Sequence, residues 1–167
     1  MKRHPDSRFD FILMNTTYHW RDQINNLVSK EFLELCKGHL NEGGILYYNT
    51  THSWDIPYTA AHVFEYVTRY SNFIAASDRP FPSSAELRHR NLLRFTYHDR
   101  PISEYDDPKL DRVLDEMANS DLNNRRDQYL SQGDLLYLIT DDNLASEFKT
   151  RKKMFTPSRN WLQLFGL

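Results

Sequence analysis

The chain opens with short apolar runs separated by polar segments. Residues 9–14 and 45–48 are apolar runs of strand length without strict alternation, which is typical of strands covered on both faces. Between them Ser29 suits the N-cap of a helix over 30–40, in which apolar residues recur at helical spacing. The pattern therefore predicts a strand, a crossover helix and a second strand that lies parallel to the first as its neighbour.

Further elements follow from the same patterns. Gly43-Gly44 is expected to stop the first helix and turn the chain. Asp55 followed by Pro57 predicts a helix from 55 to about 69. A third strand is expected at 72–77, and a fourth strand, at an edge of the sheet, at 92–97.

Beyond residue 100 the pattern changes. Asp107-Pro108 predicts a helix that ends near Asn119, and residues 119–128 are polar enough for a mobile connection. Lysine and arginine gather at 149–153, which is typical of a solvated helix face. The fold class expected from these patterns is α/β, with an α/β unit over 1–100 and a helical accessory extension over 101–167.

Composition narrows the function. The chain has 167 residues, 21 Lys plus Arg, 23 Asp plus Glu and a net charge of −2, which argues against a nucleic-acid-binding protein. Its apolar runs are far shorter than the ~20 residues of a membrane helix, and no signal peptide is expected at the N-terminus. A single cysteine, Cys36, forms neither an internal disulfide nor a zinc cluster. These features predict a cytoplasmic protein.

The ends of the first two strands repeat one motif. Asn15-Thr16-Thr17-Tyr18-His19-Trp20 and Asn49-Thr50-Thr51-His52-Ser53-Trp54 each place Asn-Thr-Thr, two more residues and a tryptophan after an apolar strand. Parallel neighbouring strands would bring both motifs to the carboxyl edge of the sheet, where open α/β sheets bind ligands. Asparagine and threonine offer uncharged donors and acceptors, and tryptophan or tyrosine can stack on a planar or cationic group.

Other interpretations of this motif stay open. Asparagine and threonine also cap helices and close turns, and tryptophan also completes cores. No histidine pattern predicts a metal site, and no sequence pattern of a nucleophilic enzyme is present. The five glycines, at positions 38, 43, 44, 133 and 166, include no Gly-x-Gly turn after a strand that would cradle a nucleoside.

Several segments resemble the spermidine synthase family. They are Phe9–Asn15, Ser29–Phe32, Leu40–Leu46 and, near the C-terminus, Ile139–Leu144 with Glu147-Phe148. The sequence is most similar to the bacterial branch in which such a domain is joined to a membrane-embedded part. The resemblance implies the later half of a Rossmann-like, methyltransferase-type domain, over 1–100. It also implies aminopropyl transfer from decarboxylated S-adenosylmethionine, as co-substrate, to a polyamine.

Two departures from the family change what is expected of this chain. The family's glycine-rich nucleoside loop comes from earlier strands, and nothing before Phe9 supplies it. The family's acidic base stands at the position of Asn15, with a second aspartate at that of Tyr18, and an amide takes no proton near neutral pH. The resemblance therefore implies a chain without a cofactor of its own and inactive alone. Its Asn15, Thr16, Thr17, Tyr18, Trp20, Asn49 and Thr50 would line the substrate side.

Two other functions remain open. The chain is alternatively a non-catalytic binding or assembly module that pairs through the outer edge of its first strand, because an unpaired edge accepts a strand from another chain. The third candidate is a methyltransferase of related fold. The partners expected are a polyamine or another cationic small molecule, and either a second copy of the chain or the missing N-terminal half, without nucleic acid.

Overall fold

A computed structural model describes residues 5–15, 24–50, 53–81 and 84–143, and all structural statements below concern these residues. Their strands are β1 (Phe9–Met14), β2 (Leu40–Asn49), β3 (Tyr66–Tyr70), β4 (Phe73–Ser77), β5 (Thr96–Tyr97) and β6 (Arg100–Pro101). The α-helices are α1 (Lys30–Gly38), α2 (Asp55–Val63), α3 (Ala85–Leu92), α4 (Pro108–Ala118) and α5 (Arg126–Leu130). Short 3-10 helices are η1 (Ile24–Leu27), η2 (Ile102–Glu104) and η3 (Gly133–Leu135).

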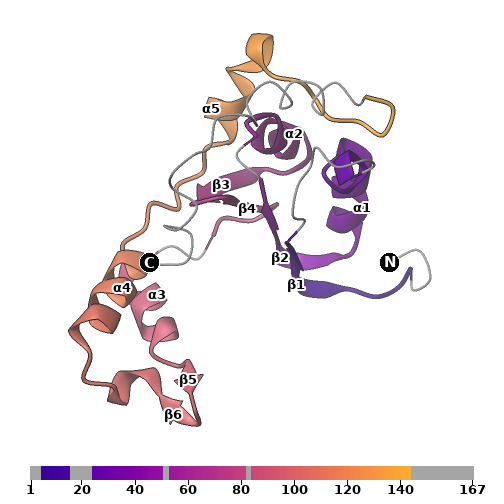
Figure 1. Cartoon of the computed structure of the whole chain (residues 1–167). Coiled ribbons are helices and arrows are strands. Elements are labelled where there is room, and N and C mark those ends of the chain that lie inside the picture. Colours follow the sequence, from indigo (N-terminus) through magenta and orange to yellow (C-terminus); the bar gives the residue numbers. More distant parts are fainter. Residues whose placement is uncertain (1–4, 16–23, 51–52, 82–83, 144–167) are drawn as a thin grey trace.

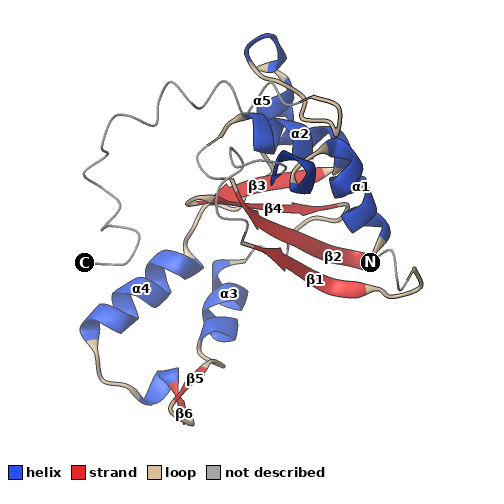
Figure 2. Ribbon diagram, turned by 45° about the vertical axis from the view of Figure 1, so that its right-hand side comes forward, coloured by secondary structure: helices blue, strands red, loops and turns tan. Residues whose placement is uncertain are grey.

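The main sheet has the order β1-β2-β4-β3. β1 pairs parallel with β2, as the sequence predicts, while β4 lies antiparallel between β2 and β3. Helices α1 and α2 cover one face of this sheet, and α3 and α4 lie toward the other (Figure 2). The prediction of an α/β fold is confirmed, and the mixed sheet is compatible with a partial Rossmann-like fold.

The core lies between the sheet and helices α1 and α2. Alternate strand residues such as Leu46, Tyr48 and Ile74 face this layer and are fully buried, together with Leu33 of α1 and Ile56 of α2. The predicted N-cap is confirmed, because Ser29 Oγ accepts from Phe32 N at 3.2 Å. This packing holds β1 and β2 side by side, so both parallel strands end at the same edge of the sheet.

The glycine pair does not end the first helix, so that prediction is wrong. Helix α1 ends at Gly38, and Gly43 and Gly44 lie inside β2, where Phe9 pairs with Leu40 but Phe11 pairs with Ile45. Gly43 has a φ of +75°, and a Cβ on Gly44 would come within 3.0 Å of the Phe9 carbonyl oxygen. The glycines therefore form a bulge in β2, which requires a left-handed residue and a close backbone approach.

Two other predictions differ from the structure. The helix predicted from residue 55 is present as α2, but it ends at Val63 and not near residue 69. Strand β3 follows, because four of the five residues in Tyr66–Tyr70 are β-branched or aromatic. The predicted strand at 92–97 is instead the end of α3 followed by the two-residue strand β5. The predicted strand at 72–77 is confirmed by β4 and the helix after Asp107 by α4, whereas the predicted connection 119–128 runs into α5.

Residues beyond α4 return to the α1–α2 layer. The backbone amide of Tyr137 donates to Asp55 Oδ1 at 2.9 Å, and that of Ile139 donates to Thr59 Oγ1 at 3.0 Å. The Ile139 carbonyl then accepts from Lys30 N at 2.8 Å. The segment 137–139 is thus hydrogen-bonded to both covering helices. Helices α3 and α4, with β5 and β6 between them, form an arm on the other side of the sheet (Figure 1).

Candidate functional site

The carboxyl ends of β1 and β2 bring two asparagines together. Asn49 Nδ2 donates to Asn15 Oδ1 at 3.2 Å, across 34 positions of sequence. This contact follows from the parallel register, in which Met14 pairs with Tyr48. The structure thus places the first residues of the two repeated motifs side by side, as the sequence predicts for neighbouring parallel strands.

A third asparagine, which the sequence analysis did not select, extends this pair. Asn72 lies in the turn between β3 and β4, and its Nδ2 donates to Asn49 Oδ1 at 2.7 Å. Thr50 Oγ1 donates in turn to Asn72 Oδ1 at 3.0 Å. We call Asn15, Asn49, Asn72 and Thr50 the amide ladder. The signal for Asn72 was a polar residue immediately before a strand, and it became meaningful only once β4 was known to lie beside β2.

Burial falls along the ladder from the sheet interior to its edge. Thr50 is fully buried and Asn72 is 8% exposed, whereas Asn49 is half-buried and Asn15 is exposed. Thr50 is further tied to the Asn72 carbonyl, to which its N donates at 2.8 Å and its Oγ1 at 3.0 Å. The buried members therefore hold the ladder in place, and Asn15 and Asn49 are the members that face outward.

The ladder has a definite chemistry. Its amide and hydroxyl groups carry no charge near neutral pH, so they donate and accept hydrogen bonds but take no proton from an amine. Tyr47 lies two residues before Asn49, and burial, reinforced by Tyr70, raises the pKa of its phenol above the usual 10. The phenol is therefore protonated at neutral pH and cannot serve as a base there. The ladder is suited to positioning a ligand rather than to proton transfer.

The structure describes only part of the residues expected at this edge. Thr16, Thr17, Tyr18 and Trp20 lie outside the described residues. Trp54 is 49% exposed, and the guanidinium carbon of Arg69 lies 5.1 Å from its ring centroid. The cation on this ring therefore comes from β3 of the same chain. A ligand cation would have to share the ring with Arg69 or displace it.

The alternative interpretation of the motif, in which these residues cap helices and close turns, is supported in part, because the Thr50 carbonyl accepts from Ser53 N at 3.0 Å and closes a turn before α2. The N-cap of α2 is Trp54, without a side-chain capping bond. Asp141, in contrast, lies at the start of α1, where its Oδ1 accepts from the N-cap hydroxyl of Ser29 at 2.5 Å. Within the described ranges no group of three or more His, Cys, Asp and Glu side chains is arranged to hold a metal ion.

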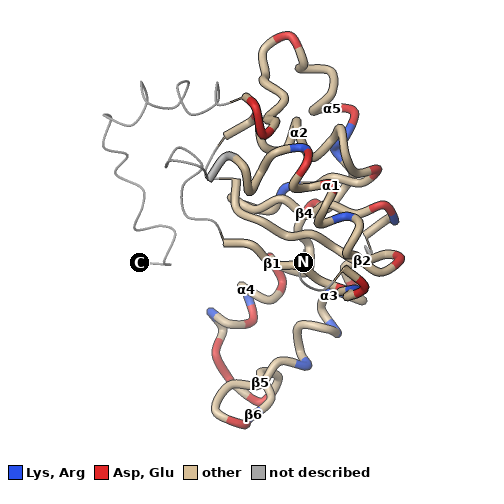
Figure 3. The backbone as a smooth tube through the Cα atoms, turned by 90° about the vertical axis from the view of Figure 1, so that its right-hand side faces the viewer, with Lys and Arg blue, Asp and Glu red and all other residues tan. Residues whose placement is uncertain are grey.

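Charge and comparison with known proteins add little to the site. Acidic and basic positions are mixed over both the sheet layer and the arm (Figure 3). Among the described residues no helix has the length and apolar character needed to cross a membrane.

The chain matches no known protein family and no curated protein. Its functional assignment therefore depends on the sequence resemblance and on the geometry of the carboxyl edge.

Proposed function

We propose that this chain is the later half of a spermidine-synthase-like domain. In this proposal it supplies the amine-facing edge of an aminopropyltransferase site that another segment or chain completes. The observation that carries the proposal is the contact of Asn15 with Asn49, at 3.2 Å, where two parallel strands end. Ligands of open α/β sheets bind beyond such strand ends. The insertion of antiparallel β4 between β2 and β3 also supports a methyltransferase-type sheet.

The reaction implied by the resemblance needs more than these residues. An amine nitrogen attacks a carbon beside the sulfonium of decarboxylated S-adenosylmethionine, so that a C–N bond forms, the C–S bond breaks and the amine loses a proton. Asn15 and Asn49 can accept hydrogen bonds from an ammonium or amine, but neither takes that proton. We therefore assign them to positioning the amine, and we assign the base and the nucleoside site to the completing segment.

The outer edge of β1 supports the idea that another strand completes the sheet. Among the described strands of the main sheet β1 pairs only with β2, and Phe9, Phe11 and Leu13 are 41%, 52% and 60% exposed. An edge strand with a row of exposed apolar side chains is a template for pairing with another strand. The buried free thiol of Cys36 agrees with a reducing cytoplasmic location, which we include in the proposal.

Isothermal titration with putrescine and decarboxylated S-adenosylmethionine tests the proposal. We expect no heat and no transfer for this chain alone. For a longer chain that carries the preceding strands we expect binding of both compounds and release of the sulfur-containing product. Substituting Asn15→Leu in the longer chain should weaken putrescine binding and leave nucleoside binding unchanged. A longer, folded chain that binds neither compound would refute the proposal.

A second candidate is a non-catalytic assembly module that pairs through β1, and the same exposed side chains favour it. Ligand binding by the longer chain distinguishes the two. An assembly module forms a stable oligomer of fixed size and stays inactive with every preceding strand present. A synthase half-domain gains ligand binding when its sheet is completed. Leu13→Lys should dissociate an oligomer built on β1, whereas Leu135→Lys, at a 78% exposed leucine of η3, is the matched control.

A further inference from the structure

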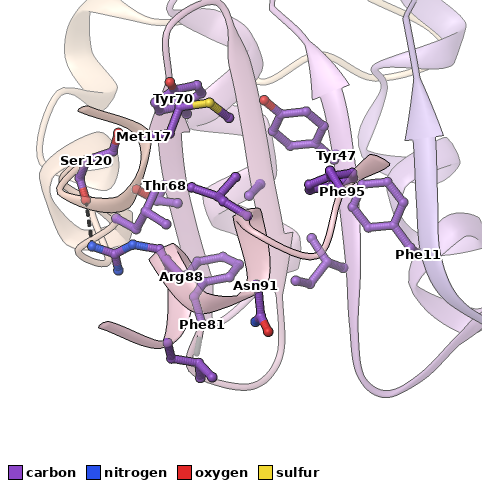
Figure 4. A pocket seen from close by; sticks show the side chains of 15 residues that line it. Phe11, Tyr47, Thr68, Tyr70, Phe81, Arg88, Asn91, Phe95, Met117 and Ser120 are labelled. Carbon is purple, nitrogen blue, oxygen red and sulfur yellow. Dashed lines mark hydrogen bonds between the residues drawn. The ribbon is translucent and has the colours of Figure 1, made fainter. Parts of the chain in front are cut away.

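A cleft of about 400 Å³ lies between the sheet and the α3–α4 arm, on the face opposite α1 and α2 (Figure 4). Its sheet side includes Phe11, Tyr47 and Tyr70, and its other side includes Phe81, Phe95 and Met117. This volume is within the range of sites for small organic ligands. The cleft is separate from the inward side of the sheet that holds the core.

The sheet side of the cleft is an ordered aromatic surface. Tyr47 stacks on Phe73 with ring centroids 4.9 Å apart and an interplanar angle of 16°, and Phe11 lies 6.1 Å from Tyr47 on its other side. These three rings come from neighbouring strands β1, β2 and β4. A flat ring between this surface and Phe95 of the arm would make stacking or edge contacts on both sides.

One polar group in the cleft lining is unsatisfied. Thr68 of β3 is 1% exposed, and its Oγ1 has no hydrogen-bond partner in the described part of the chain. A buried hydroxyl without a partner destabilises a protein by about 1–3 kcal/mol, so it needs an explanation. A ligand with one polar atom at this end of the cleft would provide the missing hydrogen bond after a small rotation of the side chain.

The charged group in the lining already has a structural role. Arg88 of α3 donates from Nε to the Ala118 carbonyl at 2.7 Å and from Nη2 to the Ser120 carbonyl at 3.2 Å. It therefore ties α3 to the C-terminal end of α4, where a cation is also favoured by the helix dipole. Because this guanidinium holds the arm together, a ligand without charge fits the cleft better than an anion.

We propose that this cleft binds an uncharged, planar aromatic molecule of about two fused rings. Its rings lie against Tyr47 and Phe11, and its single polar atom faces Thr68. The site is distinct from the amide ladder and does not depend on aminopropyl transfer. Ala75 lies in the cleft lining between Tyr47 and Thr68, with both of which it pairs in the sheet, so a larger side chain there would occupy the same volume.

Titration with naphthalene and 2-naphthol, followed by backbone amide chemical shifts, tests this proposal. We expect shifts at the amides of Tyr47, Thr68 and Ala75, and about fivefold tighter binding of 2-naphthol, the effect of one neutral hydrogen bond. Thr68→Val should remove this preference without changing naphthalene affinity. Binding of neither probe, or shifts confined to other parts of the chain, would overturn the proposal.

A filling substitution provides the second arm of the test. Ala75→Phe should reduce binding of both probes at least tenfold and leave the melting temperature unchanged or higher, because its ring occupies empty volume. Val113→Phe adds the same ring at a 48% exposed position of α4 outside the cleft lining, and should bind as wild type. If folded Ala75→Phe binds both probes as tightly as wild type, the cleft is not the site.

Discussion

The substitution Asn72→Ala tests how much the buried part of the amide ladder contributes to stability. This change removes the hydrogen bond from Asn72 Nδ2 to Asn49 Oδ1 at 2.7 Å. It also removes one of the two acceptors, Asn72 Oδ1 at 3.0 Å, that share the single hydroxyl proton of Thr50. The backbone carbonyl of residue 72 remains, so Thr50 Oγ1 and Thr50 N still donate to it. At about 1 kcal/mol for the lost neutral hydrogen bond, the free energy of unfolding should fall by about 1 kcal/mol. For a domain of this size the melting temperature should fall by about 2–4 °C.

Urea unfolding measures this loss directly, with an unchanged denaturant slope showing that the two-state comparison is valid. The matched control is Asn15→Ala, which removes one hydrogen bond at the exposed end of the ladder and should change stability by less than about 0.5 kcal/mol. In the double variant Asn49→Ala/Asn72→Ala the loss of stability should be smaller than the sum of the two single losses, because both substitutions remove the Asn72–Asn49 hydrogen bond. Equal losses of unfolding free energy for Asn72→Ala and Asn15→Ala would refute the claim that the buried members of the amide ladder contribute more to stability than the exposed one.

Three further changes have defined outcomes. Ser71 has a φ of +52°, in the left-handed region that costs a residue with a Cβ more free energy than glycine. Ser71→Gly removes this cost but raises the entropy of the unfolded chain, so the free energy of unfolding should rise by about 0.5 kcal/mol in urea unfolding. Burial raises the pKa of the Cys36 thiol from about 9 to about 11. Because only the unfolded thiol ionises in this window, stability is retained below pH 9 and falls as pH rises toward 11, and Cys36→Ala should flatten that fall. Asn15→Asp keeps an acceptor for Asn49 and adds a charge, so putrescine titrations of the longer chain that carries the preceding strands should show about two- to fivefold tighter binding that salt suppresses.

The first half of the fold was predictable because local and long-range signals agree there. Two buried-type runs with a capped amphipathic helix between them define the parallel β1–β2 pair, and this pair alone places Asn15 beside Asn49. The same agreement was absent after α2. Phe64 and Val67 continue a helical spacing, while the run Tyr66–Tyr70 favours a strand, and pairing with β4 decides the outcome. Periodicity alone does not contain that pairing.

The glycine pair illustrates a second limit of the sequence. Gly43-Gly44 signals a break in regular structure, but a helix end and a bulge in a strand use the same residues. What distinguishes them is the Phe9 carbonyl oxygen, 3.0 Å from where a Cβ on Gly44 would lie. Asn72 was missed for a related reason, since its part in the ladder depends on β4 lying antiparallel beside β2. The cleft above Tyr47 likewise forms only when the arm folds over the sheet.

Both functional candidates require that the outer edge of β1 accepts a further strand. Light scattering over a range of concentrations tests it most directly on the chain as it stands. Because Phe11 and Leu13 are exposed on a strand edge with which no other described strand pairs, we expect a mass above that of one chain, which returns to the monomer value in Leu13→Lys but not in Leu135→Lys. A folded chain that stays monomeric at every concentration, or an oligomer that Leu13→Lys leaves intact, would contradict it.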